Sequence, residues 1–329
     1  MKSVKQEKYL GDILSNDGKI DLNIQARKNK GTGYVNQIIS MLKEISFGYY
    51  YFNMAMLFRT TILINGMLCS SEALHLHGIT SAHISQLESC DIVLFKTIFS
   101  TPGSTPAAAF YLETGAVPIR FLLKGRRLMF LWTILQKNNH ELVRKVYEAQ
   151  KLFATKDDFF NQIREDCEDI GLEWDEDTFR NLKRDKFKAI VQNKIRNAAH
   201  SYLLEKKDKL SKLDNLSSDY LLKDYLASPR LSTKEKQLLF KLRTRMIDVK
   251  ANYPNNYKDE LSCTLCDSNS IENQQHVLVC PSLKGYSREQ IQYTDIFSEN
   301  IEKQIEAVKH WNNILKIREI KLKMKQTSQ

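Results

Sequence analysis

Hydrophobic residues recur at intervals of three and four along most of the chain, which is the period of an amphipathic α-helix. This spacing is clearest over 81–99, and it also predicts one or two helices within 21–44 and a last helix over about 296–322. The segment 49–76 is apolar nearly all round, so we expect it to form a central helix buried by its neighbours.

Only one stretch departs from the helical period. Residues 8–14 favour a β-strand, and the turn-forming residues at 15–18 that follow them predict a short N-terminal hairpin. Further along, the Pro-Gly-Ser-Thr-Pro sequence at 102–106 predicts a loop and then a short helix, with Ser104 or Thr105 as its cap.

Two other helix starts are marked by local chemistry. Pro118 fits the start of a helix that runs to about residue 137, because its fixed backbone angle suits the first turn. Ser232 and Glu235 form a capping-box pattern that begins a helix through about residue 249. Together these signals predict a mainly α fold.

Composition supports a folded helical protein. Hydrophobic residues make up 42% of the 329 residues and aromatic residues 10%, which excludes general disorder, and the 12 glycines and 6 prolines disfavour collagen-like chains and turn-rich β-sandwiches. The N-terminus lacks the apolar region of a secretory signal, and six cysteines are too sparse for a disulfide scaffold. We therefore expect an intracellular protein of the nucleus or cytoplasm, with no membrane span.

Charge is distributed in blocks. The net charge of +10 favours a polyanionic partner, either a nucleic acid or an anionic membrane surface. Residues 1–139 carry 15 basic and 9 acidic groups and residues 182–250 carry 18 and 8, whereas 140–181 between them carry 6 and 12. The positive field thus arises from two basic blocks separated by an acidic one.

A metal-binding pattern lies near the C-terminus. Cys263 and Cys266 are separated by two residues, and after nine more residues His276 and Cys280 follow at a spacing of four. Two cysteines in a tight turn can chelate one ion, and a His and a Cys four apart on a helix project to the same side. The four residues form the Cys₃His ligand set of a closed, structural zinc site, which does not imply metal-assisted hydrolysis.

Several short segments, in this order, carry a resemblance. They are Lys8-Tyr-Leu-Gly with Ser-Asn-Asp-Gly at 15–18, the segment 62–74 with its Ser-Ser-Glu-Ala-Leu ending, the segment 112–131 containing Gly-Arg-Arg-Leu-Met-Phe-Leu, and the Cys₃His array. The set resembles the C-terminal part of the reverse transcriptases of non-LTR (LINE-type) retrotransposons, over most of the chain. Leu74 departs from that pattern, because a Trp commonly stands there.

The resemblance implies a division into domains and a missing activity. Together with the change of charge, which places a domain boundary near 140–156, it predicts the end of a palm over 1–20, a helical thumb-like domain over 21–140, a charged helical domain over 141–255, and a zinc knuckle with a C-terminal helix over 256–329. The polymerase aspartates of this family precede the segment at Lys8, so the chain by itself is expected not to be an enzyme. The Asp157–Asp158 pair favours a solvated helix start instead.

Basic rows on two predicted helices are the candidate phosphate contacts. Their members are Arg120, Lys124, Arg126 and Arg127 on the first helix, and Lys241, Arg243 and Arg245 on the second. Each row also fits the ordinary solvated face of an amphipathic helix. The sequence predicts binding of RNA, an RNA/DNA hybrid or DNA through the sugar-phosphate backbone. The alternatives are a helical protein-interaction module and a non-functional relic, both with a purely structural zinc site.

Overall fold

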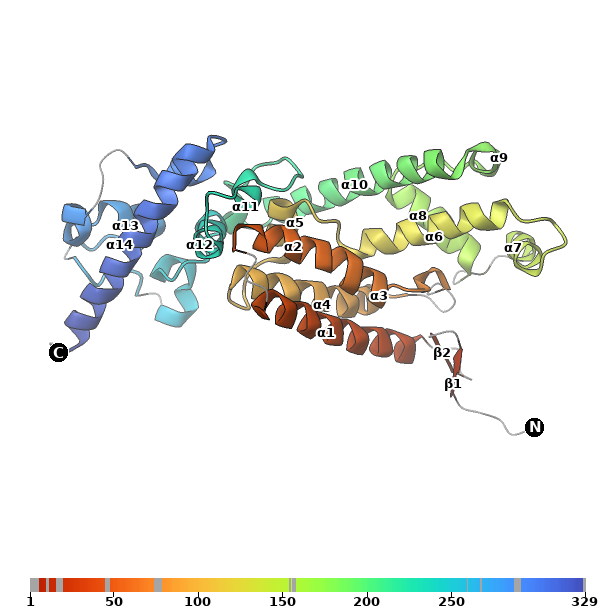
Figure 1. Ribbon diagram of the computed structural model, residues 1–329, viewed down its shortest axis with the longest axis horizontal. Helices are drawn as coiled ribbons and strands as arrows, with labels where there is room; N and C mark the ends of the chain where they lie inside the picture. The colour runs from red at the N-terminus through yellow and green to blue at the C-terminus, as the bar shows by residue number, and fades with distance from the viewer. Residues whose placement is uncertain are drawn as a thin grey trace. The chain divides into compact units, whose positions relative to one another are not determined.

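The computed structural model describes residues 6–9, 12–15, 20–44, 48–73, 79–153, 155, 158–258, 260–266, 268–286 and 291–327 (Figure 1). The described chain is mainly α-helical, as the sequence predicts. It divides into two compact units. Unit 1 comprises Met1–Glu44, Met56–Leu94 and Ala116–Glu205, and unit 2 comprises Ile45–Ala55, Phe95–Gly115 and Lys206–Gln329. Because these segments alternate along the chain, the units do not coincide with the four consecutive domains that the sequence predicts.

Two short strands lie near the N-terminus of unit 1. Strands β1 (Gln6–Tyr9) and β2 (Asp12–Ser15) pair antiparallel, and Lys8 lies opposite Ile13 (Figure 1). The sequence predicts a different arrangement, with one strand over 8–14 followed by a turn at 15–18. That hairpin is not supported, because Lys8 and Leu14 belong to different strands. Residues 16–18 of the expected turn lie outside the described residues.

The helices of unit 1 surround an apolar core. They are α1 (Asp21–Glu44), α2 (Tyr51–Phe58), the π-helical segment η2 (Arg59–Ile64), α3 (Asn65–Met67), α4 (Ser81–Phe99), α6 (Ile119–Leu135), α7 (Leu142–Leu152), α8 (Phe159–Asp169), α9 (Glu176–Asn181) and α10 (Arg184–Asp208). The boundaries between the units fall inside α2, α4 and α10. Helix α1 packs on η2 and α3, while α6 packs on α7, α8 and α9.

The helix expected over 49–76 ends earlier than predicted. After α2, η2 and α3, the backbone turns at Ser70, whose φ of 55° lies in the left-handed region. The buried guanidinium of Arg27, on α1, donates hydrogen bonds to the carbonyl oxygens of Met67 at 2.9 Å and of Ser70 at 3.2 Å. This side chain therefore satisfies carbonyl groups that the helix end leaves without helical partners.

Other predicted helix boundaries agree closely with the structure. Helix α4 spans the predicted 81–99, and α6 follows Pro118 as its N-cap. Asp158 caps α8 by accepting the backbone N–H of Asn161, so this aspartate marks a helix start as predicted, while Asp157 lies outside the described residues.

Unit 2 is built on a cluster of aromatic rings. Its helices are α5 (Ala107–Thr114), α11 (Asp224–Ala227), α12 (Thr233–Arg243), α13 (Gln274–Val279) and α14 (Ile301–Thr327). The ring of Phe240 on α12 stacks on Phe99 and Phe110, with centroids 4.0 and 5.3 Å apart. Trp311 of α14 is fully buried, and α14 packs on α12. Stacked aromatic pairs add to the free energy gained by burying their area.

Local caps begin and end the helices of unit 2. Ser232 and Glu235 form the predicted capping box of α12, which ends at Arg243 and is shorter than expected. Helix α5 begins differently from the prediction, because Pro106 is its N-cap and no side chain caps it. Gly115 ends α5 with a φ of 65°, a conformation that glycine adopts without steric cost. None of the described helices has the length and apolarity needed to cross a bilayer.

Candidate metal centre

A short loop and a short helix of unit 2 bring the four predicted ligands together. Cys263 and Cys266 lie on a loop whose strand-like ends meet at an antiparallel bridge between Ser262 and Ile271. The backbone N–H of Cys263 donates to the carbonyl of Ser270 at 2.8 Å, which closes the loop. We call residues 260–286 the knuckle.

Helix α13 presents the other two ligands. Asn273 is its N-cap, and the Asn273 side chain accepts the backbone N–H of His276 at 2.8 Å. Cys280 is the C-cap, and Pro281 follows it, where a helix can no longer continue. His276 and Cys280 are therefore held one helical turn apart, as their spacing predicts.

The ligand atoms converge on one point. The four atoms all lie within 4.8 Å of one another. The Sγ atoms of Cys263 and Cys280 are 4.0 Å apart, and the Sγ of Cys266 is 3.4 Å from Nε2 of His276. Ligands at about 2.0–2.3 Å from a shared tetrahedral ion lie about 3.3–3.8 Å from one another. The group can therefore hold a metal ion with only small movements of its side chains.

The thiols of the cluster differ in acidity. Burial opposes ionisation of Cys266, but hydrogen bonds from the hydroxyl and backbone N–H of Ser268 and from the neighbouring thiols outweigh it, and they lower the pKa of Cys266 to about 6. Burial raises the pKa of Cys280 to about 12, and the nearby sulfurs of Cys263 and Cys266 add to the increase. One thiolate is thus favoured near neutral pH, and a bound cation would favour ionisation of the remaining thiols.

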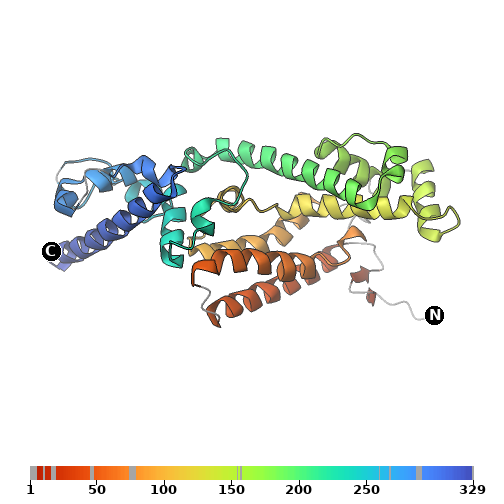
Figure 2. The same ribbon diagram turned by 45° about the horizontal axis from the view of Figure 1, so that its top comes forward.

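Helix α14 supports the knuckle through cationic side chains. Lys325 donates to the carbonyl of Thr264 at 2.6 Å, and Lys321 donates to the carbonyl of Ser282 at 2.7 Å. Arg318 forms a buried ion pair with Glu272, with Nε 2.8 Å from Oε1. Figures 1 and 2 show the knuckle beside α14 in both views. Order at the metal centre is therefore coupled to the position of this helix.

The residues of the first predicted basic row, on α6, do not form a common solvent-exposed face. The guanidinium of Arg120 pairs with the carboxylate of Glu88 through contacts of 2.9 and 2.7 Å. Arg127 is buried and pairs with Asp166 at 2.6 and 2.8 Å, and Lys124 pairs with the same carboxylate at 3.3 Å. Carboxylates of α4 and α8 pair with these three cations, so the three do not form an open basic row, and phosphate contact by them stays a prediction.

Arg126 differs from its neighbours on α6. Its guanidinium donates to the carbonyl of Leu68 at 2.8 Å and to Oδ1 of Asn65 at 3.1 Å. These acceptors are uncharged, so the positive charge of Arg126 is not neutralised by them. Arg126 therefore remains a candidate anion contact.

The second predicted row, on and after α12, is also dispersed. Arg243 is buried and pairs with Glu113 at 2.9 and 3.0 Å, so it is not available to a phosphate. Burial lowers the pKa of Lys241. Arg245 lies beyond the end of α12 with a left-handed φ of 53°, so it does not continue a helical row.

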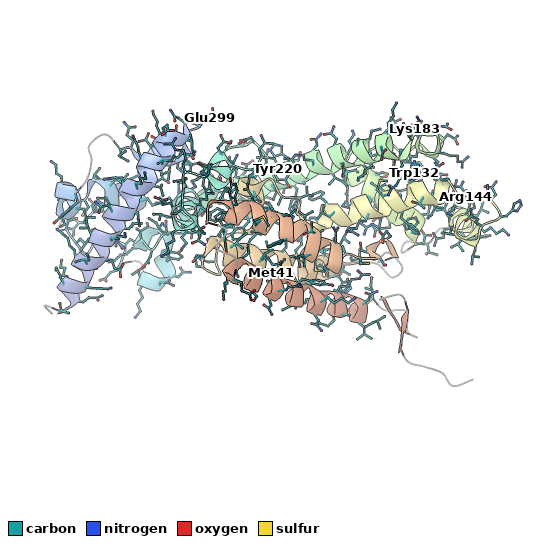
Figure 3. All side chains as sticks on the ribbon, in the orientation of Figure 1. Met41, Trp132, Arg144, Lys183, Tyr220 and Glu299 are labelled. Atoms are coloured by element: carbon teal, nitrogen blue, oxygen red, sulfur yellow. The ribbon has the colours of Figure 1, made fainter. Side chains whose placement is uncertain are left out.

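Exposed cations gather instead at the start of α10, where Lys183, Arg184, Lys186 and Lys188 are exposed, whereas Lys194 and Arg196 are half-buried. Between Lys183 and Arg196 the chain has six basic residues and one acidic residue, Asp185. The side chain of Lys183 is drawn at the outer side of α10, close to where Trp132 of α6 donates its indole N–H to the carbonyl of Leu182 at 3.0 Å (Figure 3). Positions 184, 188, 192 and 196 follow one another at intervals of four, so they share one helical face, and three of them are basic while the fourth is Gln192.

Comparison with known proteins adds no relative. No family model, curated protein or solved structure matches the chain. A retrotransposon origin therefore stays a prediction from the short sequence motifs.

Proposed function

We propose that this chain is a zinc-ordered helical protein that binds nucleic acid, as the non-catalytic C-terminal portion of a LINE-type reverse transcriptase. The observation that carries the binding function is the exposed start of α10. Lys183, Arg184, Lys186 and Lys188 are all exposed there, beside a single acidic residue, Asp185. A cluster of this sign attracts phosphate groups and releases the counterions condensed on them.

Zinc is the metal that the ligand set favours. Three thiols and one imidazole are soft or borderline ligands, which suit Zn²⁺ better than Mg²⁺ or Ca²⁺. Four protein ligands complete a tetrahedron, so the ion would serve a structural purpose and leave no coordination position for a substrate. Its position between the loop at Cys263 and helix α13 means that zinc would hold these two segments together.

The metal proposal is tested by one substitution and a matched control. Cys266→Ser should lower bound zinc from about one ion per chain to well below that, because three ligands remain, and hydrogen exchange should quicken over 260–286. Cys69→Ser changes an exposed cysteine of unit 1 and should leave both measurements unchanged. Wild-type protein without zinc by elemental analysis after preparation in zinc-containing buffer would contradict the assignment.

The binding proposal is tested on the zinc-replete full chain. Fluorescence anisotropy with labelled single-stranded RNA, an RNA/DNA hybrid and duplex DNA should show binding that weakens steeply as salt rises, because counterion release drives it. The relative affinities of the three probes identify the preferred partner. No binding to any probe at 50 mM salt (about 14 Å Debye length) would reject a nucleic-acid function.

A second candidate function has its own observation. Helix α7 and the residue after it expose large apolar side chains, with Leu142 at 76%, Leu152 at 78% and Phe153 at 79% of full exposure. Exposed apolar side chains in one region are typical of protein-binding surfaces. A helical interaction module would show weak RNA binding that does not depend on the cations of α10.

A further inference from the structure

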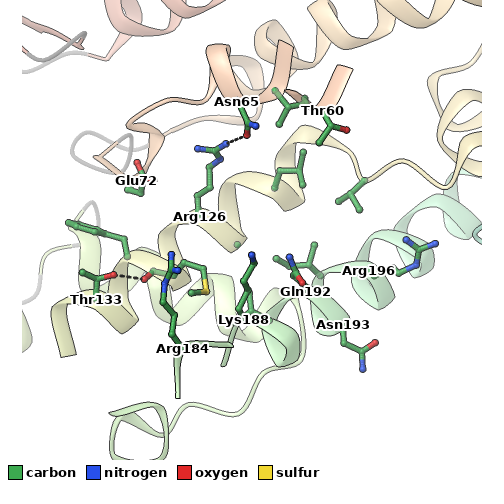
Figure 4. Close-up of a pocket in the computed structure, with 18 residues that line it drawn as sticks. Thr60, Asn65, Glu72, Arg126, Thr133, Arg184, Lys188, Gln192, Asn193 and Arg196 are labelled. Atoms are coloured by element: carbon green, nitrogen blue, oxygen red, sulfur yellow. Dashed lines mark hydrogen bonds between the residues drawn. The ribbon is translucent and has the colours of Figure 1, made fainter. Parts of the chain in front are cut away.

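Unit 1 contains a large pocket that the sequence did not predict. Its volume is about 990 Å³, and it is lined by residues of η2, α3, α6 and α10 (Figure 4). Helices α6 and α10 approach closely beside it, because Gly125 has no side chain, and a Cβ atom there would lie 2.5 Å from Cδ1 of Ile195. The volume is at the upper end of the range for small-molecule sites, about 300–1,000 Å³.

Positive charge dominates the lining. Arg126 comes from α6, and Arg184, Lys188 and Arg196 come from α10, against the single carboxylate of Glu72. Lys188 and Arg184 extend in the same direction from α10, toward α6 (Figure 4). Both side chains are exposed, and neither forms an ion pair with another of the described residues. Cations in a concave site reinforce one another's field, so an anion should bind there more strongly than on an open helix face.

The remaining lining is apolar or carries amide groups. Leu122, Met129 and Phe130 of α6 provide an apolar wall. The amides of Asn65 and Gln192 supply hydrogen-bond donors and acceptors. A ligand that fits all of these features has a phosphate group, a flat apolar part and polar edges.

We propose that this pocket binds a nucleoside phosphate unit, with its phosphate against Arg184 and Lys188 and its base against the apolar wall. The unit is one nucleotide of a single strand or a free nucleotide, because both present the same chemistry. The inference rests on the proposed function and deepens it by naming the contact site. Single-strand sites generally combine a basic groove with surfaces on which bases lie.

The test compares two charge-matched double variants of the zinc-replete full chain, using fluorescein-labelled octauridylate. Arg184→Gln with Lys188→Gln removes two pocket cations, whereas Lys183→Gln with Lys186→Gln removes two exposed cations of the same segment that do not line the pocket. The pocket pair should weaken binding by about tenfold or more and reduce the salt slope by about 1–2. The control pair should change the affinity by no more than about threefold, through the general field alone.

A third variant separates shape from charge. Thr133 lies on the pocket lining and is exposed, so Thr133→Trp should narrow the pocket without altering its charge. It should weaken octauridylate binding by about fivefold and leave the salt slope unchanged, because no phosphate contact is lost. Circular dichroism and thermal unfolding of each variant identify any loss of folding.

The outcomes distinguish the pocket from the broader function. Equal weakening by the two double variants, or no weakening by either, would overturn the pocket while nucleic-acid binding stands. Competition by a polyglutamate peptide equal to that of unlabelled octauridylate would also overturn it, since the site would then bind any polyanion. If the wild-type protein fails to bind octauridylate, calorimetry with adenosine monophosphate tests whether the pocket binds a free nucleotide. Binding of adenosine monophosphate that is lost in the Arg184→Gln, Lys188→Gln variant but kept in the control variant supports a free-nucleotide site. No binding of adenosine monophosphate by the wild type rejects the pocket together with the proposed function.

Discussion

Helices α6 and α10 are both rich in basic residues, yet their cations have opposite environments. On α6, Arg120 and Arg127 pair with carboxylates, and Arg127 is buried. On α10, Arg184 and Lys188 are exposed and line a pocket in which a single carboxylate, that of Glu72, faces four cations. Basic composition alone therefore does not identify a nucleic-acid-binding face.

The difference follows from which segment covers each helix. Helix α8 packs on α6 and carries Asp166 and Asp169, which come from the acidic block at 140–181. That block lies between the two basic blocks in sequence, and in the structure its carboxylates neutralise cations of the first one. A block of basic residues in a sequence is thus a candidate anion-binding surface only for those cations that are not paired with carboxylates of the same chain.

The largest expected effect on stability comes from a substitution that breaks the ion pairs of α6. Asp166→Asn removes the charge that Arg127 and Lys124 share, and it leaves a buried guanidinium without its carboxylate. Breaking such a pair on one side costs about 3–5 kcal/mol, so the free energy of unfolding in urea should fall by that amount. Asp169 also pairs with Lys124 but is 60% exposed, and Asp169→Asn should cost less than about 1 kcal/mol. Equal costs for the two variants would show that burial does not set the difference.

A second prediction concerns a buried cation of unit 2 that, unlike Arg127 of α6, donates to a backbone carbonyl. Lys236 on α12 is fully buried and donates to the carbonyl of Leu226 at 2.9 Å, and burial lowers its pKa to about 8 from an ordinary value of 10.5. Below pH 8 both the folded and the unfolded chain carry the proton, so the cost of burying the charge is fully present. Between pH 8 and 10.5 the folded chain loses the proton first, and stability rises with pH.

This linkage is measured against a variant that lacks the titrating group. The free energy of unfolding of the wild type, relative to that of Lys236→Met, should increase by about 2 kcal/mol between pH 7.5 and 9.5. Urea unfolding at both pH values gives the difference, in which the titration of shared groups cancels. A constant difference between the two proteins would mean that Lys236 keeps an ordinary pKa in the folded chain.

Local sequence chemistry predicted much of the fold. The bounds of α4 and the capping box at Ser232 follow from interactions within a few residues, and so does the convergence of the metal ligands around Cys263 and His276. Such short-range patterns depend on helical geometry and turn closure, which the sequence specifies directly. The support of the knuckle by α14 was not visible, because Arg318 and Glu272 are 46 residues apart.

The binding residues were the least predictable part. The spacing of Arg120, Lys124 and Arg127 correctly places them along α6, but it does not say that α8 covers them. The pocket requires residues from three parts of unit 1, including Asn65, and a close approach at Gly125. Tertiary packing decides which helical face stays open, and a single sequence carries little information about that packing.

The smallest expected effect tests whether the cations of α10 truly lack a structural purpose. Lys183→Gln with Lys186→Gln removes exposed charges and should change the free energy of unfolding by less than about 0.5 kcal/mol, as surface substitutions usually do. At low salt the sign should be slightly stabilising, because neighbouring like charges repel and salt screens them. A loss above about 1 kcal/mol would mean that these lysines are held in stabilising contacts, and α10 would then resemble α6 instead of contrasting with it. Unaffected stability, together with binding of octauridylate that weakens by no more than about threefold at low salt, is the combination expected of charges that act only through the general field.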